Sequence, residues 1–153
     1  MKLDGIDLKI LRELQTDGKL PNTELARRVN LSASPCLTRV KRMESQGLIR
    51  NYVALLNPIE LGLRLNVFIF ISLKAQSRQA LKEFESRVCS HDEVMECYLM
   101  TGDADYLIRV AMRDVESLEK FIVESLSPMP EIEKIRSSFA LKQVRYKTAL
   151  PLD

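Results

Sequence analysis

The chain contains no tryptophan, one histidine and three cysteines among its 153 residues. The cysteines, Cys36, Cys89 and Cys97, form no C-x-x-C pair, and their odd number excludes a complete disulfide framework. With His91 alone, the sequence offers no cluster of metal ligands. No apolar run approaches the roughly 18 residues of a membrane-spanning helix. The sequence therefore predicts a protein of the reducing cytoplasm that needs no metal, uses no cofactor and does not enter a membrane.

Positive charge is concentrated in the N-terminal part of the chain. Residues 1–60 hold ten Lys/Arg against seven Asp/Glu, a net of +3, whereas residues 61–153 hold thirteen against fourteen, a net of −1. Residues 23–50 alone hold six basic and two acidic side chains, a net of +4. This distribution indicates a polyanionic partner for the N-terminal region.

Two short helices are predicted before residue 30. Asp4 is a suitable N-cap for the first, with an apolar stripe behind it, and Gly18 ends it. The second helix, 22–29, is expected to be capped by Asn22 or Thr23. The apolar stripe of the first helix consists of Ile6, Ile10, Leu11 and Leu14.

A third helix follows a tight turn at Asn30, which tolerates the left-handed conformation. It is expected to start at Ser32 or Ser34 and to end at Gly47, with residues 48–56 forming a strand as a wing. Its predicted apolar face consists of Cys36, Leu37, Val40 and Met43. Its predicted exposed face and flanks consist of Ser34, Pro35, Thr38, Arg39, Lys41 and Arg42.

This combination of short helix, tight turn and basic helix is typical of a helix-turn-helix that binds double-stranded DNA. The major groove admits one α-helix, whose hydroxyl and basic side chains reach bases and phosphates. The six residues of the exposed face and flanks are the predicted DNA contacts. The alternative is a solvated basic face on an ordinary three-helix unit.

The remainder of the chain alternates between strand and helix patterns, in the order βαββαβ of a ferredoxin-like domain. The fold class is therefore α+β, with a winged helix-turn-helix domain at 1–57, a linker at 58–64 and the second domain at 65–153. The expected strands are 65–73, 94–101, 105–112 and 132–146, and the expected helices are 78–89 and 115–126.

The first strand of that domain is apolar on both faces. Val67, Ile69 and Ile71 point one way, and Phe68 and Phe70 point the other way. Because two helices cover only one face of such a sheet, the other face requires a partner. The pattern predicts self-association, and a two-fold dimer would present two DNA-binding helices to a roughly palindromic site.

The stretches "LDGIDLKILRELQTDGKLPNTELARRVNLSASPCLTRVKRMESQGLI", "ALLNPIELGL", "GDADYLIRV" and "SSFALKQVRYKTALPL" together resemble the Lrp/AsnC (feast/famine) family of transcriptional regulators. The chain is most similar in character to the branch that regulates branched-chain keto-acid dehydrogenase genes. The resemblance implies regulation of amino-acid metabolism genes, a small amino-acid effector bound where dimers meet, and homodimers that assemble into octamers or similar rings.

The stretch "TGDADY" is, on its residues alone, a hairpin turn. Its two carboxylates and exposed N–H groups are also suited to the ammonium and carboxylate of a free amino acid. The family's effector motif resembles G-x-x-D-Y/F, which matches Gly102, Asp105 and Tyr106, with Thr101 and Asp103 as neighbours. A branched-chain or other apolar amino acid is the expected effector.

Three other functions compete with this interpretation: an enzyme, a ligand-independent architectural DNA-binding protein, and an oligomerising adaptor that binds protein and whose DNA affinity would be indifferent to salt. An enzyme is not expected, because no nucleophile–base pair can be built around His91 and the N-terminal region is too short for a catalytic domain. A ligand-independent architectural DNA-binding protein remains the open alternative.

Overall fold

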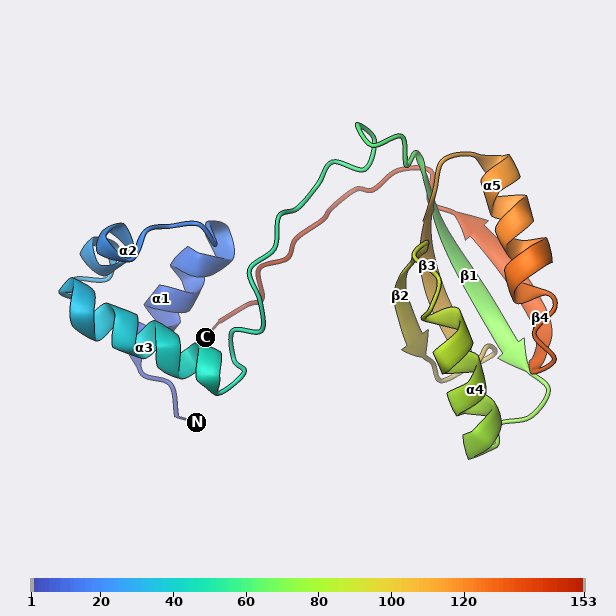
Figure 1. The fold of residues 1–153 in the computed structure, drawn as a ribbon, viewed down its shortest axis with the longest axis horizontal. Helices are drawn as coiled ribbons and strands as arrows, with labels where there is room; N and C mark the ends of the chain where they lie inside the picture. Colours follow the sequence, from blue (N-terminus) through green and yellow to red (C-terminus); the bar gives the residue numbers. More distant parts are fainter. Residues whose placement is uncertain (1, 153) are drawn as a thin grey trace. The chain divides into compact units, whose positions relative to one another are not determined.

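The computed structural model describes residues 2–152, so Met1 and Asp153, the outermost residues of the predicted domain ranges, lie outside it. The chain folds into two compact units (Figure 1). The first unit contains the residues up to Leu55 together with the segment from Val144 onward, and the second contains Leu56–Gln143. The predicted range 65–153 assigned the C-terminal segment to the second domain, whereas the structure packs it with the first unit.

The first unit is a bundle of three helices, α1 (Gly5–Thr16), α2 (Asn22–Arg28) and α3 (Ala33–Ser45). The predicted N-cap of α1 is confirmed: Asp4 Oδ1 accepts hydrogen bonds from the N–H groups of Ile6 and Asp7, at 2.9 and 2.8 Å. The Asp7 side chain accepts the Asp4 N–H in return, which completes a capping box. The buried core of the unit consists of Ile10, Leu11, Leu25, Ala26, Val29, Cys36, Val40 and Met43.

The turn between α2 and α3 forms as expected, and Ser32 is the N-cap residue of α3, whereas the expected caps of α2 do not form. Asn30 has a φ of 58°, in the left-handed region. The N-cap of α2 is Pro21 rather than Asn22 or Thr23, and Asn22 Nδ2 instead donates to the Ala33 carbonyl at 2.8 Å. Ser32 precedes α3 without a side-chain hydrogen bond. Asn22 therefore ties α2 to the start of α3.

Two further expectations for the first unit are wrong. Leu37, predicted on the buried face of α3, is 40% exposed. Residues 48–56 form no strand within the described chain, because no neighbouring segment supplies the main-chain partners that a strand requires. Val53 and Leu55 of that segment are exposed. The apolar alternation marks a surface segment there rather than one half of a buried pair.

The second unit is an antiparallel sheet covered on one face by helices (Figure 1). The strand order β2-β3-β1-β4 and the βαββαβ sequence of elements confirm the ferredoxin-like arrangement. The final strand ends at Phe139 rather than Tyr146. The elements are β1 (Leu65–Leu73), α4 (Arg78–Val88), β2 (Val94–Leu99), β3 (Tyr106–Met112), α5 (Val115–Lys120), its continuation η1 (Phe121–Leu126) and β4 (Ile132–Phe139).

The two faces of this sheet have different surroundings. On the helix-covered face, Val67, Ile69 and Ile71 are fully buried against both helices. On the open face, Phe68 pairs across the strands with Arg109, and Phe70 pairs with Leu107. The two phenylalanines are only half-buried there. This face, defined by Phe68, Phe70, Leu107, Arg109 and the neighbouring side chains of β2 and β4, is called the open sheet face below.

Candidate functional sites

The exposed face of α3 carries three of the predicted contact residues in a row. Ser34, Thr38 and Lys41 follow one another at helical spacing, and all three are exposed. Thr38 Oγ1 donates to the Ser34 carbonyl at 3.1 Å, so its hydroxyl is turned back along the helix. Pro35 and Leu37 are exposed beside them. Among residues 2–152, Lys41 forms no ion pair, so its charge is free for a partner.

The two predicted arginines are held inside the unit by the start of α1. Arg39 Nη1 donates to Asp4 Oδ2 at 2.6 Å and to Asp7 Oδ1 at 2.9 Å. Arg42 Nη2 donates to the other oxygen of Asp7 at 2.6 Å. The side chains of Arg39 and Arg42 are 26% and 42% exposed, while Asp7 is 1% exposed. These arginines therefore connect α3 to α1 and leave only part of each guanidinium accessible.

Asp7 is a buried carboxylate with every partner supplied by its own unit. Burial alone would raise its pKa, but hydrogen bonds from the Asp4 N–H, Arg39 and Arg42 outweigh burial and lower the pKa below the ordinary value for an aspartate. The carboxylate is thus ionised at neutral pH and fixes the rotation of α3. The sequence does not reveal this role of Asp7, because nothing in the spacing links residue 7 to residues 39 and 42.

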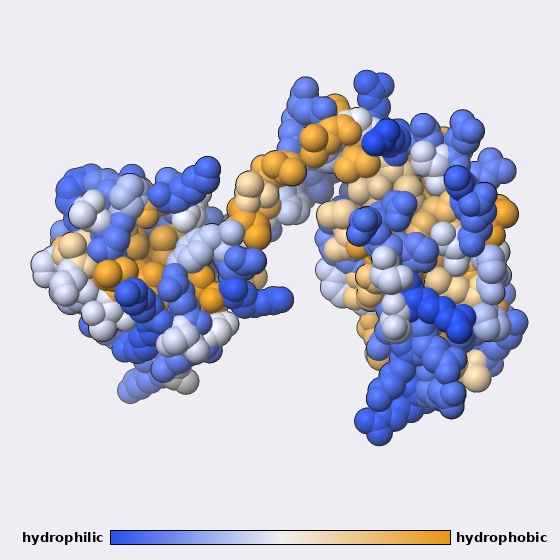
Figure 2. Space-filling view, in the orientation of Figure 1, coloured by the Kyte–Doolittle hydropathy of each residue, from blue (hydrophilic) through white to orange (hydrophobic). Residues whose placement is uncertain are grey.

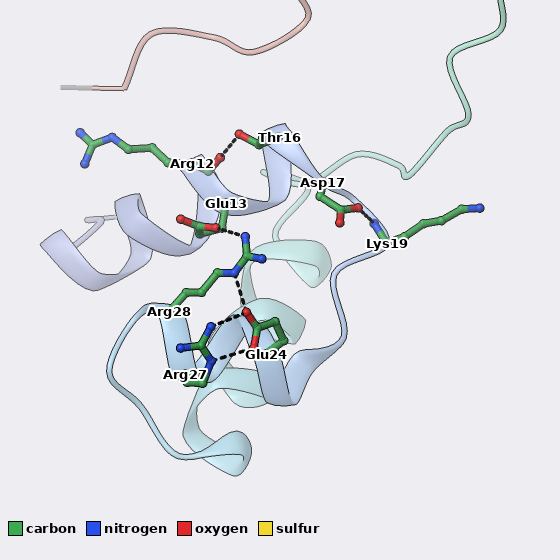
Figure 3. Close-up of polar contacts among 8 residues, drawn as sticks. All are labelled: Arg12, Glu13, Thr16, Asp17, Lys19, Glu24, Arg27 and Arg28. Carbon is green, nitrogen blue, oxygen red and sulfur yellow. Dashed lines mark hydrogen bonds and ion pairs between the residues drawn. The ribbon is translucent and has the colours of Figure 1, made fainter.

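The basic residues of α2 are also neutralised within the unit (Figure 3). Arg28 lies between Glu13 of α1 and Glu24 of its own helix, at 2.8 and 2.9 Å, and Arg27 pairs with Glu24 at 2.8 Å. The bonds from Arg27 and then Arg28 lower the pKa of Glu24 to about 2. Of the six basic residues in 23–50, the four arginines of α2 and α3 are thus paired with carboxylates of the same unit, and Lys41 is the cation of α3 that has no ion pair among residues 2–152.

The stretch "TGDADY" forms the predicted turn between β2 and β3. The Met100 N–H donates to the Asp105 carbonyl at 2.8 Å, and Gly102 has a φ of 118°, which L-residues rarely adopt. Thr101, Gly102 and Asp103 are exposed at the tip. Within residues 2–152, the N–H groups of Gly102 and Asp103 donate to no protein acceptor.

Asp105 faces into the protein rather than outward. Its carboxylate accepts the Leu73 N–H at 2.7 Å and a Gln76 side-chain N–H at 2.6 Å. Its own N–H donates to the Ile71 carbonyl at 3.0 Å. Asp105 therefore fastens the turn to the end of β1 and to the loop before α4. Gln76 was missed in the sequence, where no pattern distinguishes it from other loop residues.

Tyr106 is part of the core beneath the turn. It is 1% exposed, its ring packs at 4.5 Å from that of Phe84, and its hydroxyl donates to Glu85 Oε1 at 2.7 Å. Burial, followed by the bond to Glu85, raises its pKa above the ordinary value for a tyrosine. Of the five predicted effector residues, the structure brings Thr101, Gly102 and Asp103 together on the surface and uses Asp105 and Tyr106 as their support.

Comparisons with known proteins cover both units. The family model described as winged helix-turn-helix DNA-binding matches residues 3–50, and the model described as Lrp/AsnC ligand binding domain matches residues 66–150. The chain belongs to the Lrp/AsnC family. Members of this family are DNA-binding transcriptional regulators that respond to amino acids, and the chain is accordingly a regulator rather than an enzyme.

Relatives of known name match from end to end. The chain is 42% identical over 151 residues to the Bkd operon transcriptional regulator of Pseudomonas aeruginosa, covering 99% of both proteins. It is 41% identical to the leucine-responsive regulatory protein of Rhizobium meliloti, covering 95% of this chain and 93% of that one. The similarity to a regulator named for the bkd operon agrees with the branch indicated by the sequence.

Solved structures of the family share the fold. A transcriptional regulator from Neisseria meningitidis, solved as a complex with L-Met, has a TM-score of 0.95 at 39% identity, covering 99% of this chain and 98% of that one. An AsnC family regulator from Agrobacterium tumefaciens has a TM-score of 0.93 at 40% identity, covering 97% of each chain.

Between residues 2 and 152, no three His, Cys, Asp or Glu side chains come together as a metal site. In the same residues, none of the helices has the length and apolar character needed to cross a membrane.

Proposed function

We propose that this Lrp/AsnC regulator binds its operator as a homodimer that presents two copies of α3 to one duplex. The proposal rests on the observation that the side chains of α3 fall into two groups, one paired inside the unit and one exposed to solvent. Arg39 and Arg42 are anchored to the buried Asp7, while Lys41 and the hydroxyl-bearing side chains face solvent. An oriented helix whose exposed face carries basic and hydroxyl-bearing side chains is suited to the major groove.

Within this surface, the six predicted contact residues have different roles. Ser34, Pro35 and Thr38 lie near the N-terminus of α3, from which side chains of such helices reach base edges. Lys41 neutralises phosphate, and the accessible parts of Arg39 and Arg42 add to its field. Leu37, exposed on the same face, supplies an apolar surface that suits a thymine methyl group.

The open sheet face supports the homodimer. It exposes an aromatic strip that the helices of the same copy do not cover, with Phe70 beneath the Arg136 guanidinium at 4.8 Å. A second copy meeting this face by two-fold symmetry would bury Phe68 and Phe70 in both subunits. Octamers or related rings would then form from such dimers.

The exposed tip of the turn is the proposed effector site. The free N–H groups of Gly102 and Asp103 suit an amino-acid carboxylate, and the Asp103 carboxylate suits the ammonium. We propose a branched-chain or other apolar amino acid as the effector and a position between dimers for the turn. Similarity to the bkd regulator and to a structure that holds L-Met supports this class of ligand.

A selection for genomic DNA bound by the purified protein, with and without each candidate amino acid, tests the proposal. We expect paired half-sites whose centres lie about one helical turn, or a multiple of it, apart. Calorimetry across the twenty amino acids separates the architectural alternative, because a ligand-independent protein would give no heat at millimolar concentrations. Enrichment of single, unpaired sites would contradict the dimer.

A further inference from the structure

Two side chains of α1 form hydrogen bonds with the main chain near the C-terminus. Gln15 recognises the main chain of Leu150 on both sides: its Oε1 accepts the Leu150 N–H at 2.6 Å and its Nε2 donates to the Leu150 carbonyl at 3.2 Å. Arg12 Nη2 donates to the Leu152 carbonyl at 2.7 Å. In Figure 3, Arg12 extends away from the Glu13–Arg28–Glu24 network toward the C-terminal trace. Residues 148–152 are called the tail below.

An apolar contact accompanies these hydrogen bonds. The Leu152 side chain packs against the core of the three-helix unit. Beside it lies a cavity of about 490 Å³ lined by α1, residues 48–53 and the tail. Tyr52 forms part of this lining, with its hydroxyl donating to Glu44 at 3.0 Å. The tail thus occupies a groove built by the DNA-binding unit.

The stretch between β4 and the tail shows that docking is local. Leu141 and Val144 are 98% and 89% exposed, whereas Leu152 is half-buried. Residues 140–147 therefore act as a spacer, and the tail is the part of the C-terminal segment that makes specific contacts with the DNA-binding unit.

We propose that this groove is a docking site for the chain's own tail, and that the docked tail is a releasable second tether of the DNA-binding unit. The chain leaves this unit at residue 55 and returns to it at residue 144. Residues 56–64 are the covalent link, and the docked tail is a second, non-covalent link. A unit held by two links explores less space, which raises the effective concentration of the second α3 once the first has bound a duplex.

Hydrogen exchange at the tail tests the docking itself and does not depend on the proposed function. The Leu150 N–H should exchange slowly in the full-length protein, and Gln15→Ala should speed it by about tenfold or more, because both hydrogen bonds between Gln15 and the Leu150 main chain are lost. Gln46→Ala is the matched control, since Gln46 is exposed just past the end of α3. Equally fast exchange in the wild type and in Gln15→Ala would overturn the docking site.

DNA binding tests the tether and rests on the proposed pairing of two copies. The probes are a duplex with two half-sites recovered by selection and the same duplex with one half-site scrambled. We expect Leu152→Asp to weaken binding to the first about tenfold and to leave binding to the second unchanged. Leu141→Asp, the same change at an exposed position, is the control, and Gln15→Ala repeats the experiment should Leu152→Asp fail to fold.

A uniform loss on both duplexes would overturn the tether, because it would make the tail a structural part of the DNA-binding unit. Wild-type affinity of both variants for both duplexes would overturn it as well. If neither duplex bound the wild type, the proposed function would fail while the exchange result still stood.

Mixed dimers test whether each tail docks on the DNA-binding unit of its own copy or on that of the other copy. In a dimer of one Leu152→Asp chain and one Gln15→Ala chain, docking within each copy leaves both tails unprotected. Docking between copies would leave one intact tail in one intact groove, and about half of the protection would survive. The proposal requires full loss of protection, and half protection would overturn it.

Discussion

The two units differ in how completely a single copy of the chain supplies polar partners and apolar cover for its own side chains. In the DNA-binding unit, the buried Asp7 has all its partners within the unit, and Leu152 of the tail packs against the core. In the effector unit, one sheet face is covered by helices and the open face leaves Phe68 and Phe70 half-exposed. Figure 2 shows a further apolar strip over the linker, where Leu56, Ile59 and Leu61 are exposed.

This difference indicates which parts of the regulator form by themselves and which depend on assembly. A three-helix unit that closes its own core can present α3 correctly in one copy. A sheet with an uncovered aromatic face loses apolar contact until a second copy arrives. In the proposed complex, specificity for DNA would therefore originate in the self-contained unit, and the number of α3 helices on one duplex would depend on the pairing of the second unit.

The largest expected effect comes from a charge on the open sheet face. Phe68→Asp should dissociate the dimer, because an unpaired carboxylate buried between two copies costs several kcal/mol. Sedimentation velocity should show single copies. Val123→Asp, which places the same charge at a residue 58% exposed on η1, should keep the assembly. A dimeric Phe68→Asp variant would remove the open sheet face from the interface.

Removal of the buried carboxylate in the DNA-binding unit should have the next largest effect. Asp7→Asn should lower the free energy of unfolding by about 2 kcal/mol, since charge-assisted hydrogen bonds to two arginines are lost. Because the pKa of Asp7 is lowered by folding, its contribution is present above about pH 4 and is lost as the pH falls through the folded-state pKa. The stability difference between wild type and variant should therefore shrink in acid.

Chemical denaturation at several pH values measures this contribution. Asp17→Asn is the control, because Asp17 is exposed and its side chain accepts a hydrogen bond only from the Lys19 N–H. A difference that stayed constant down to pH 2 would show that Asp7 does not act through its charge.

Substitutions of Lys41 and of Arg42, which is paired with Asp7, should have different effects on stability. Lys41→Ala should weaken operator binding about tenfold, reduce the salt dependence by about one phosphate contact and leave the melting temperature unchanged. Arg42→Ala should also lower the melting temperature, because it leaves the buried Asp7 without one partner. Sequence reasoning treated the surroundings of Arg42 as solvated. Equal melting temperatures for the two variants would support that simpler interpretation instead.

The smallest expected effect distinguishes the two carboxylates of the effector turn. Asp103→Asn should weaken amino-acid binding by about 1 kcal/mol without changing stability, because Asp103 lies at the exposed tip. Asp105→Ala should weaken binding and also destabilise the effector unit, since Leu73 and Gln76 lose their acceptor. Calorimetry and thermal melting of both variants test this. An unaltered effector affinity in Asp103→Asn would exclude a contact with the ammonium.

The sequence predicted the elements with strong local patterns and missed the contacts between distant residues. The alternation of β1 predicts its bounds, Leu65–Leu73, because every second side chain is apolar over nine residues. Nothing local predicts the pairing of Asp7 with Arg39 and Arg42, which only the packing of α1 against α3 creates. The shortened β4 also depends on a distant segment, because its partner β1 begins at Leu65 and the pairing ends at Val67 and Phe139.

The effector turn shows a similar division. Gly102 and the carboxylates identify a turn from residue type alone, and Gly102 indeed has a positive φ. Which carboxylate faces outward depends on the end of β1, where the Leu73 N–H captures Asp105. Sequence motifs therefore locate the turn, whereas tertiary hydrogen bonds divide its residues between the exposed tip and its buried support.

Sedimentation equilibrium of the unmodified protein, without DNA and over micromolar to nanomolar concentrations, tests the central claim most directly. If the open sheet face is closed by a second copy, the mass at micromolar concentration will be an even multiple of the 17.5 kDa chain. A single-copy mass across the whole range would contradict the account, because it would leave the aromatic face in water and give each molecule only one α3.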